Sequence, residues 1–130
     1  MKTILIADPD LSTAGAADVL DRHGLTTLVV SEARTALTIV RSGTPIDLVI
    51  TEIRLPDMDG LAFLDTLKHC RPELPVLVVT SSGSIESYLY AVNLGVVEYL
   101  NKPVLTKELS GLISRVLDHH ARPGVSFDAA

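Results

Sequence analysis

Residues 3–8 read Thr-Ile-Leu-Ile-Ala-Asp, an apolar run that stops abruptly on a carboxylate. Three later runs also end on a polar, chemically capable residue: Leu48–Thr51 before Glu52, Val76–Val79 before Thr80, and Val97–Leu100 before Lys102. Short continuous apolar runs are typical of strands that are buried on both faces, as in a parallel sheet. The sequence therefore predicts a buried sheet whose strands deliver reactive side chains to one edge.

Helical patterns separate these runs. We expect helices at about Leu11–His23, from Ser31 to about Ser42–Gly43, from Asp59, from Ser84 to about Leu94, and at Thr106–His120, with a further strand at Thr26–Val30. Parallel strands need crossover connections, and right-handed crossovers leave few topologies. The predicted fold class is α/β: a three-layer, doubly wound, five-stranded parallel sheet of order 2-1-3-4-5 with five helices.

Two side chains in turn positions are predicted to cap helices. Ser31 precedes an amphipathic pattern, and Asp59 precedes another. The side-chain oxygen of such a residue accepts a hydrogen bond from a free N–H group of the first helical turn. In the helix after Ser31, the expected buried face consists of Ala33, Ala36, Leu37 and Val40.

Length and composition limit the possible classes of protein. The 130 residues suffice for one domain, and we assign residues 1–120 to it and residues 121–130 to a flexible tail or linker. A net charge of −5 argues against direct binding of nucleic acid, which depends on neutralising phosphates. The single cysteine, Cys70, fits a reducing compartment. No apolar run reaches the ~18 residues that span a membrane, so a cytoplasmic protein without membrane contact is expected.

The polar residues at the strand ends form the candidate site. In an open parallel sheet, ligands bind in the crevice at the carboxyl ends of the strands. With the predicted strand order, Asp8 and Glu52 become neighbours there, and Thr80 and Lys102 lie on the next strands along. Two carboxylates, a hydroxyl and an ammonium are suited to phosphate or metal chemistry. We expect an ion pair between Glu52 and Lys102.

These motifs, in this order, resemble the receiver domain of two-component response regulators. The segments that carry the resemblance are Ile4–Asp8, Asp47–Glu52, Leu55–Gly60 (Leu-Pro-Asp-Met-Asp-Gly), Val76–Thr80 and Tyr99–Pro103 (Tyr-Leu-Asn-Lys-Pro). The resemblance covers about residues 2 to 120 and implies a CheY-like, flavodoxin-like fold. Each segment is a weak signal alone, but the set is highly specific.

The resemblance implies a role for each matching residue. The phosphoacceptor position is Glu52, the acidic pocket is Asp8 and Asp10, the phosphoryl contacts are Thr80 and Lys102, and the switch aromatic is Tyr99. In the family, an aspartate at the acceptor position takes a phosphoryl group from a histidine kinase with the help of Mg²⁺. If Mg²⁺ binding survives here, the ligands would be Asp8, Glu52 and the backbone carbonyl of Arg54. These oxygen donors suit a hard cation.

The chain departs from the family pattern at two positions. Glu52 stands where the family has aspartate, and Pro9 stands where it has a second acid. The extra methylene of Glu52 moves the carboxylate outward by about 1.5 Å, and an error of roughly 1 Å in attack geometry can cost about 10²-fold in rate. We therefore predict a degenerate receiver that works without phosphorylation. We expect no enzymatic activity and no cofactor, with Mg²⁺ bound at most weakly.

Two further hypotheses concern the charges in the crevice. Glu52 places a negative charge where a phosphorylated aspartate would lie, so it could mimic the phosphorylated state, although it lacks the additional oxygens of phosphate. Arg54 is two residues from Glu52, and its guanidinium could fill the vacated cation site. The ordinary interpretation of Arg54 is a solvated side chain.

The expected partners are other signalling proteins. We expect them to bind the face formed by the fourth helix, fifth strand and fifth helix, where Tyr88 or Tyr90 should point outward. Tyrosine is enriched at binding hot spots. The candidate partners are a histidine kinase, an output protein or a second copy of the chain.

An enzymatic alternative starts from Asp8-Pro9-Asp10. This segment resembles the Asp-x-Asp motif of haloacid-dehalogenase-like phosphatases, in which the first aspartate attacks phosphate, the second is an acid–base and Mg²⁺ assists. No paired acidic motif follows Lys102, and the first connection is too short for a substrate cap. Flavin binding at the same crevice would need a phosphate-cradling loop after the first strand, which residues 8–10 do not provide.

Overall fold

The computed structural model describes residues 2–10 and 24–120 of the chain. The elements are β1 (Thr3–Ala7), β2 (Thr26–Val30), α2 (Ala33–Arg41), β3 (Leu48–Thr51), α3 (Gly60–Cys70), β4 (Val76–Thr80), α4 (Ile85–Leu94), β5 (Glu98–Asn101) and α5 (Thr106–His120). Strands and helices alternate from β2 onward, as predicted. The helix expected at about Leu11–His23 and the tail at residues 121–130 lie outside the described residues.

The five strands form one parallel sheet in the order β2-β1-β3-β4-β5. The predicted strand order is therefore confirmed. β1 lies between β2 and β3, and its last residue, Ala7, is opposite Thr51 of β3. Three strands (β1, β3 and β4) are almost completely buried, which agrees with their continuous apolar sequences.

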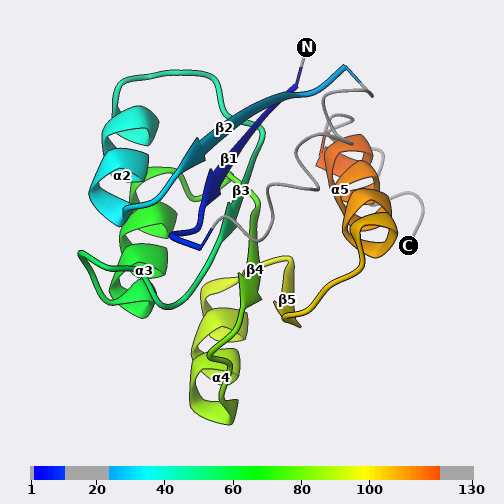
Figure 1. The fold of residues 1–130 in the computed structure, drawn as a ribbon. Helices are drawn as coiled ribbons and strands as arrows, with labels where there is room; N and C mark the ends of the chain where they lie inside the picture. Colours follow the sequence, from blue (N-terminus) through cyan, green and yellow to red (C-terminus); the bar gives the residue numbers. More distant parts are fainter. Residues whose placement is uncertain (1, 11–23, 121–130) are drawn as a thin grey trace.

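Helices cover both faces of the sheet (Figure 1). α2, α3 and α4 pack on one face around Phe63, Leu64 and Leu67, and α5 packs on the other face with Ile113 at its centre. The three-layer arrangement is confirmed, with four helices in the described part of the chain where the sequence predicts five. None of these helices is long and apolar enough to cross a membrane.

The helix ends show where the capping predictions succeed and where one fails. The Asp59 carboxylate accepts a hydrogen bond from Leu61 N–H at the start of α3, as predicted. Ser31 does not cap α2: the residue at its N-cap is Glu32, whose side chain makes no capping bond. The Asp57 carboxylate caps α2 instead, from the β3–α3 loop, because the folded sheet places that loop at the helix end.

The remaining differences from the prediction are small. The buried face of α2 consists of Ala33, Ala36, Leu37 and Val40, as expected. α4 ends at Gly95, which adopts the left-handed conformation (φ 88°) that favours glycine. β5 begins and ends one residue later than predicted, at Glu98–Asn101 instead of Val97–Leu100, because its ladder with β4 starts at the pair Leu77–Glu98.

Candidate functional site

The carboxyl ends of the central strands bring the predicted side chains together. Backbone hydrogen bonds fix the residue after each strand: Asp8 N–H donates to Val30 C=O, Glu52 N–H to Ala7 C=O, and Lys102 N–H to Thr80 C=O. Asp8, Glu52 and Thr80 are all buried. The sheet thus delivers two carboxylates, a hydroxyl and an ammonium to one place, as the sequence predicts.

The Lys102 ammonium lies among three carboxylates. Its Nζ is 2.8 Å from Asp8 Oδ2, 3.2 Å from Glu52 Oε1 and 3.2 Å from Asp10 Oδ2. The Lys102 side chain is only 11% exposed, and those of Asp8 and Glu52 are 3% exposed. The expected Glu52–Lys102 ion pair is present, and it belongs to a larger cluster in which one cation faces three anions.

Backbone and side-chain donors surround the Glu52 carboxylate. Oε2 accepts hydrogen bonds from Ile53 N–H at 2.7 Å and Arg54 N–H at 3.2 Å, and Oε1 accepts from Ser81 N–H at 3.1 Å and Ser81 Oγ–H at 3.3 Å. Burial would raise the pKa of Glu52, but the hydrogen bonds from Thr80 and from the three backbone N–H groups outweigh it. The pKa therefore lies below its ordinary value, and Glu52 is ionised at neutral pH.

The neighbouring carboxylates raise the pKa of Lys102. Burial alone would lower the pKa of Lys102, but hydrogen bonds and Coulomb attraction from Asp8, Asp10 and Glu52 outweigh burial and raise it. Lys102 therefore stays protonated throughout the physiological range. The Lys102–Pro103 peptide bond that follows is cis.

The Asp8–Asp10 segment is a turn around Pro9. Asp8 Oδ1 accepts a hydrogen bond from Asp10 N–H at 3.0 Å, while Asp8 Oδ2 contacts Lys102. Asp10 is more than half exposed, yet its carboxylate reaches back to the same ammonium. The residue beyond Pro9 therefore contributes charge to the pocket, although Pro9 itself has no carboxylate to offer.

The side chains that would hold Mg²⁺ are already bonded to protein groups. The ligands implied by the resemblance are Asp8, Glu52 and the carbonyl of Arg54. Protein donors occupy both oxygens of Glu52, and the Lys102 ammonium contacts Asp8 and Glu52 and offsets one of the three negative charges of the cluster. Within the described residues, no three His, Cys, Asp or Glu side chains are grouped as a metal site.

The Arg54 side chain is exposed, and the cation among the carboxylates is Lys102. The hypothesis that the Arg54 guanidinium fills a vacated cation site is therefore not supported. Arg54 contributes its backbone N–H to Glu52 instead.

The β3–α3 loop that supplies these backbone donors is tethered at several points. Asp57 accepts hydrogen bonds from Ala33 N–H at 2.8 Å and Arg34 N–H at 2.9 Å. Burial opposes ionisation of Asp57, but these two bonds and the Arg34 guanidinium outweigh it and hold the pKa below its ordinary value. At the end of the loop, Gly60 packs so closely against the Ile53 carbonyl that a Cβ atom would clash with it.

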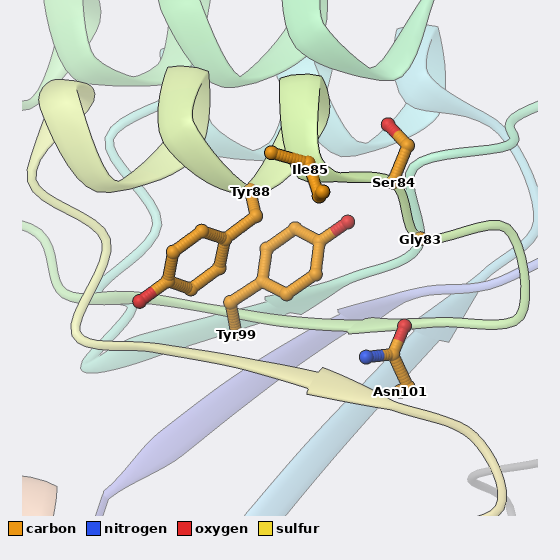
Figure 2. A pocket seen from close by; sticks show the side chains of 6 residues that line it. All are labelled: Gly83, Ser84, Ile85, Tyr88, Tyr99 and Asn101. Atoms are coloured by element: carbon orange, nitrogen blue, oxygen red, sulfur yellow. The ribbon is translucent and has the colours of Figure 1, made fainter.

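Tyr99 on β5 points toward α4 (Figure 2). Its hydroxyl is hydrogen-bonded to Ser87 Oγ, and the rings of Tyr88 and Tyr99 pack edge to face with centroids 5.4 Å apart. Beside them lies an open groove of about 350 Å³, lined by Gly83, Ser84, Ile85, Tyr88, Tyr99 and Asn101. Sequence reasoning placed Tyr99 correctly on the fifth strand but missed Ser87.

α4 exposes five large apolar or aromatic side chains. Its exposed large hydrophobic residues are Ile85, Tyr88, Leu89, Tyr90 and Val92. Both Tyr88 and Tyr90 are exposed, where the sequence required only one of them to point outward. A contiguous apolar patch on a helix face commonly marks a protein-interaction surface.

Two of the functional contacts lacked a clear signal in the sequence. Ser81 follows Thr80 directly, so its proximity to the site could have been inferred from the strand end, but its bond to Glu52 is visible only in the folded structure. Asp57 has the composition of an ordinary turn residue, and only its folded position reveals the cap on α2.

This combination of topology and strand-end residues defines a receiver-type signalling domain. The family described as "Response regulator receiver domain" matches residues 4–114. The chain therefore belongs to the receiver domains of two-component response regulators.

Two curated transcriptional regulators are similar in sequence to this chain. Transcriptional regulatory protein ZraR of Escherichia coli is 33% identical over 117 residues, which is 89% of this chain and 26% of that protein. DNA-binding transcriptional regulator NtrC of Salmonella typhimurium is 34% identical over 118 residues, 90% of this chain and 25% of that protein. The chain thus spans about a quarter of the length of these curated relatives.

Solved structures share the fold over almost the whole chain. A CheY-like receiver domain protein from Methanospirillum hungatei has a TM-score of 0.88 at 28% identity and covers 95% of this chain and 99% of its own. NtrX from Brucella abortus has a TM-score of 0.83 at 29% identity, and the match covers 100% of this chain and 30% of NtrX.

Proposed function

We propose that this receiver domain signals through protein contacts, without phosphoryl transfer at Glu52. The observation that carries the proposal is the contact of Lys102 with Asp8, Asp10 and Glu52. A carboxylate nucleophile needs a free oxygen and a cation that can accept the incoming phosphate charge. Here both oxygens of Glu52 accept protein hydrogen bonds, and the cation that contacts Asp8 and Glu52 is the Lys102 ammonium.

The same contacts favour one fixed signalling state. Glu52 engages Thr80 and Lys102, the two groups to which the resemblance assigns the phosphoryl oxygens. The Glu52 carboxylate therefore bonds permanently to Thr80 and Lys102, the side chains that would otherwise contact a phosphoryl group. We infer that Glu52 acts as a built-in anion in this pocket, and that the domain neither requires Mg²⁺ nor catalyses a reaction.

The partner surface that fits this function is the face formed by α4, β5 and α5. Its exposed apolar members include Ile85, Leu89 and Leu105. The NtrC4 receiver domain, 25% identical with a TM-score of 0.83, has been solved as a dimer in its beryllofluoride-activated form. A second copy of the chain, a histidine kinase and an output protein are the candidate partners. We expect no direct binding of nucleic acid or of a membrane. The expected compartment is the cytoplasm.

The experiment that tests the proposal is intact-mass spectrometry after incubation with Mg²⁺ and acetyl phosphate. The wild-type chain should gain no mass. The variant Glu52→Asp with Pro9→Asp restores the acids of the family pattern and serves as the matched positive control. A single phosphoryl group mapped to Glu52 of the wild type would show that the switch survives with an unusual acceptor, and the proposal would be wrong.

The phosphatase alternative receives little support from the site. Asp8 would be the nucleophile, but its Oδ2 is 2.8 Å from Lys102 Nζ and its Oδ1 accepts the Asp10 N–H. Hydrolysis of a chromogenic phosphate ester that disappears in Asp8→Asn would favour this alternative. We expect no turnover by either protein.

A further inference from the structure

We infer that Ser87 is a positioning residue that holds Tyr99 against α4 independently of the Glu52 site and so fixes the shape of the groove beside it. The consequence for partner binding rests on the proposed function, because the groove belongs to the proposed partner surface. The positioning itself rests only on the contacts of Ser87 and Tyr99.

The Ser87 hydroxyl is fully used in a small network at the start of α4. Ser87 is buried, and its Oγ donates to Ser84 C=O at 3.2 Å and accepts from Ser84 N–H at 3.2 Å and from Ser84 Oγ–H at 3.1 Å. Its contact with Tyr99 OH is 2.5 Å long, and either hydroxyl can be the donor in it. A hydroxyl has one donor and two acceptor positions, so these contacts use the full capacity of the Ser87 side chain.

Steric contacts leave the Tyr99 ring little room. The ring of Tyr88 lies edge-on to it at 5.4 Å between centroids. On the other side, Gly83 has no side chain, and a Cβ atom there would come within 3.2 Å of the Tyr99 hydroxyl and collide with the Asn101 amide oxygen. Figure 2 shows Tyr99 enclosed between Tyr88 and the turn at Gly83, with the groove alongside.

The polar contacts of Tyr99 and of the Glu52 site are separate in the described part of the chain. Thr80 Oγ1 accepts from Ser82 N–H at 3.0 Å and also bonds to Glu52, whereas the Tyr99 hydroxyl bonds to Ser87 on α4. Because Ser87 is supplied by the helix and not by the pocket, Tyr99 has an anchor that does not involve Glu52 directly. The pocket reaches the start of α4 through the loop at Ser81, whose N–H and hydroxyl bond to Glu52, and the Glu52→Gln variant tests that route.

The tyrosines of this protein make the inference easy to observe. The chain has three tyrosines and no tryptophan, and all three (Tyr88, Tyr90 and Tyr99) lie on α4 or β5. Tyrosine signals in the near-ultraviolet circular dichroism and in nuclear magnetic resonance of ring-labelled protein therefore report on this surface alone. The specific readout is the nuclear Overhauser effect between the rings of Tyr88 and Tyr99.

The test compares Ser87→Ala with Ser84→Ala and Ser87→Thr. Ser87→Ala should lose the Tyr88–Tyr99 Overhauser effect and the near-ultraviolet dichroism, while the far-ultraviolet helix signal is kept. Ser84→Ala removes the capping side chain and its bond to Ser87 Oγ but keeps the hydroxyls of both Ser87 and Tyr99, so the ring contact should remain. Ser87→Thr retains the hydroxyl and should restore the signal. Tyr99→Phe removes the same hydrogen bond from the strand side and keeps the ring, so it should show the same loss if Ser87→Ala does not fold.

Three results would overturn the inference. An unchanged ring contact in both Ser87→Ala and Tyr99→Phe would mean that packing alone positions Tyr99. An equal loss in Ser84→Ala would assign the effect to the helix cap. Loss of the contact in Glu52→Gln would couple Tyr99 to the pocket. Phosphorylation of Glu52 in the mass experiment would refute the proposed function but leave the Ser87 result standing, so the two failures are distinguishable.

Discussion

Replacing Lys102 by methionine tests the ion cluster most directly. The side chains have similar lengths, so the substitution removes the ammonium and keeps most of the packing. Asp8 and Glu52 are then left buried without their cation, while Asp10, which is more than half exposed, can be solvated by water. We therefore expect a loss of stability that comes chiefly from two buried carboxylates.

The contacts allow a rough magnitude. Removing one partner of a buried ion pair costs about 3–5 kcal/mol. Glu52 keeps its backbone and Ser81 donors, and Asp8 keeps the Asp10 N–H, so we expect a value near the lower end, about 3 kcal/mol. With a urea m-value of about 2 kcal/mol/M, the unfolding midpoint should fall by roughly 1.5 M.

The assay is urea unfolding at several pH values, followed by far-ultraviolet circular dichroism. Lys107→Met is the matched control, because it removes an exposed ammonium from the start of α5 by the same substitution. In the wild type, the lowered pKa of Glu52 contributes stability that is lost as pH falls through that pKa, below the ordinary value of 4.5. The raised pKa of Lys102 contributes stability at all pH values below its ordinary value of 10.5, and this is lost only above that value.

The penalty of Lys102→Met should therefore be largest between these limits and shrink in acid, where the carboxylates become protonated. A midpoint at pH 7 within about 0.3 M of the wild type, with an unchanged m-value, would refute the reasoning. Such a result would mean that the Lys102 ammonium is effectively solvated. A penalty independent of pH would assign the effect to packing instead of charge.

Three further predictions concern the loop and the pocket. Asp57→Ala should cost about 1 kcal/mol through loss of the cap on α2 and speed amide exchange at the first turn of that helix; unchanged exchange there would contradict the cap. Gly60→Ala should cost about 1–3 kcal/mol because the new Cβ meets the Ile53 carbonyl, whereas Gly111→Ala, with open space around it, should stabilise α5 by about 1 kcal/mol in thermal unfolding. Glu52→Gln should weaken the acid dependence of stability below pH 4.5, and a wild-type acid profile in that variant would show that other groups cause it.

The fold could be predicted from the sequence because local patterns and topology rules point in the same direction. The strands β1, β3 and β4 are continuous apolar runs, and their burial on both faces is what such runs require. The same reasoning failed at Ser31, where a good capping residue stands next to the helix but the cap comes from Asp57, in a loop about 24 residues away. The capping propensity of Ser31 takes no account of Asp57, which only the folded chain brings to the start of α2.

The sequence by itself determined which residues stand at the strand ends, and thus that Asp8, Glu52, Thr80 and Lys102 share a site. It also showed the extra methylene of Glu52 and the loss of an acid at Pro9. Only the tertiary structure decided how these charges are satisfied: Lys102 bonds to Asp8 across 94 residues of chain, and Tyr99 bonds to Ser87 on a neighbouring element. The physical reason is that the pattern along a chain fixes which face a side chain takes, whereas the distance and direction between two side chains depend on how the layers pack.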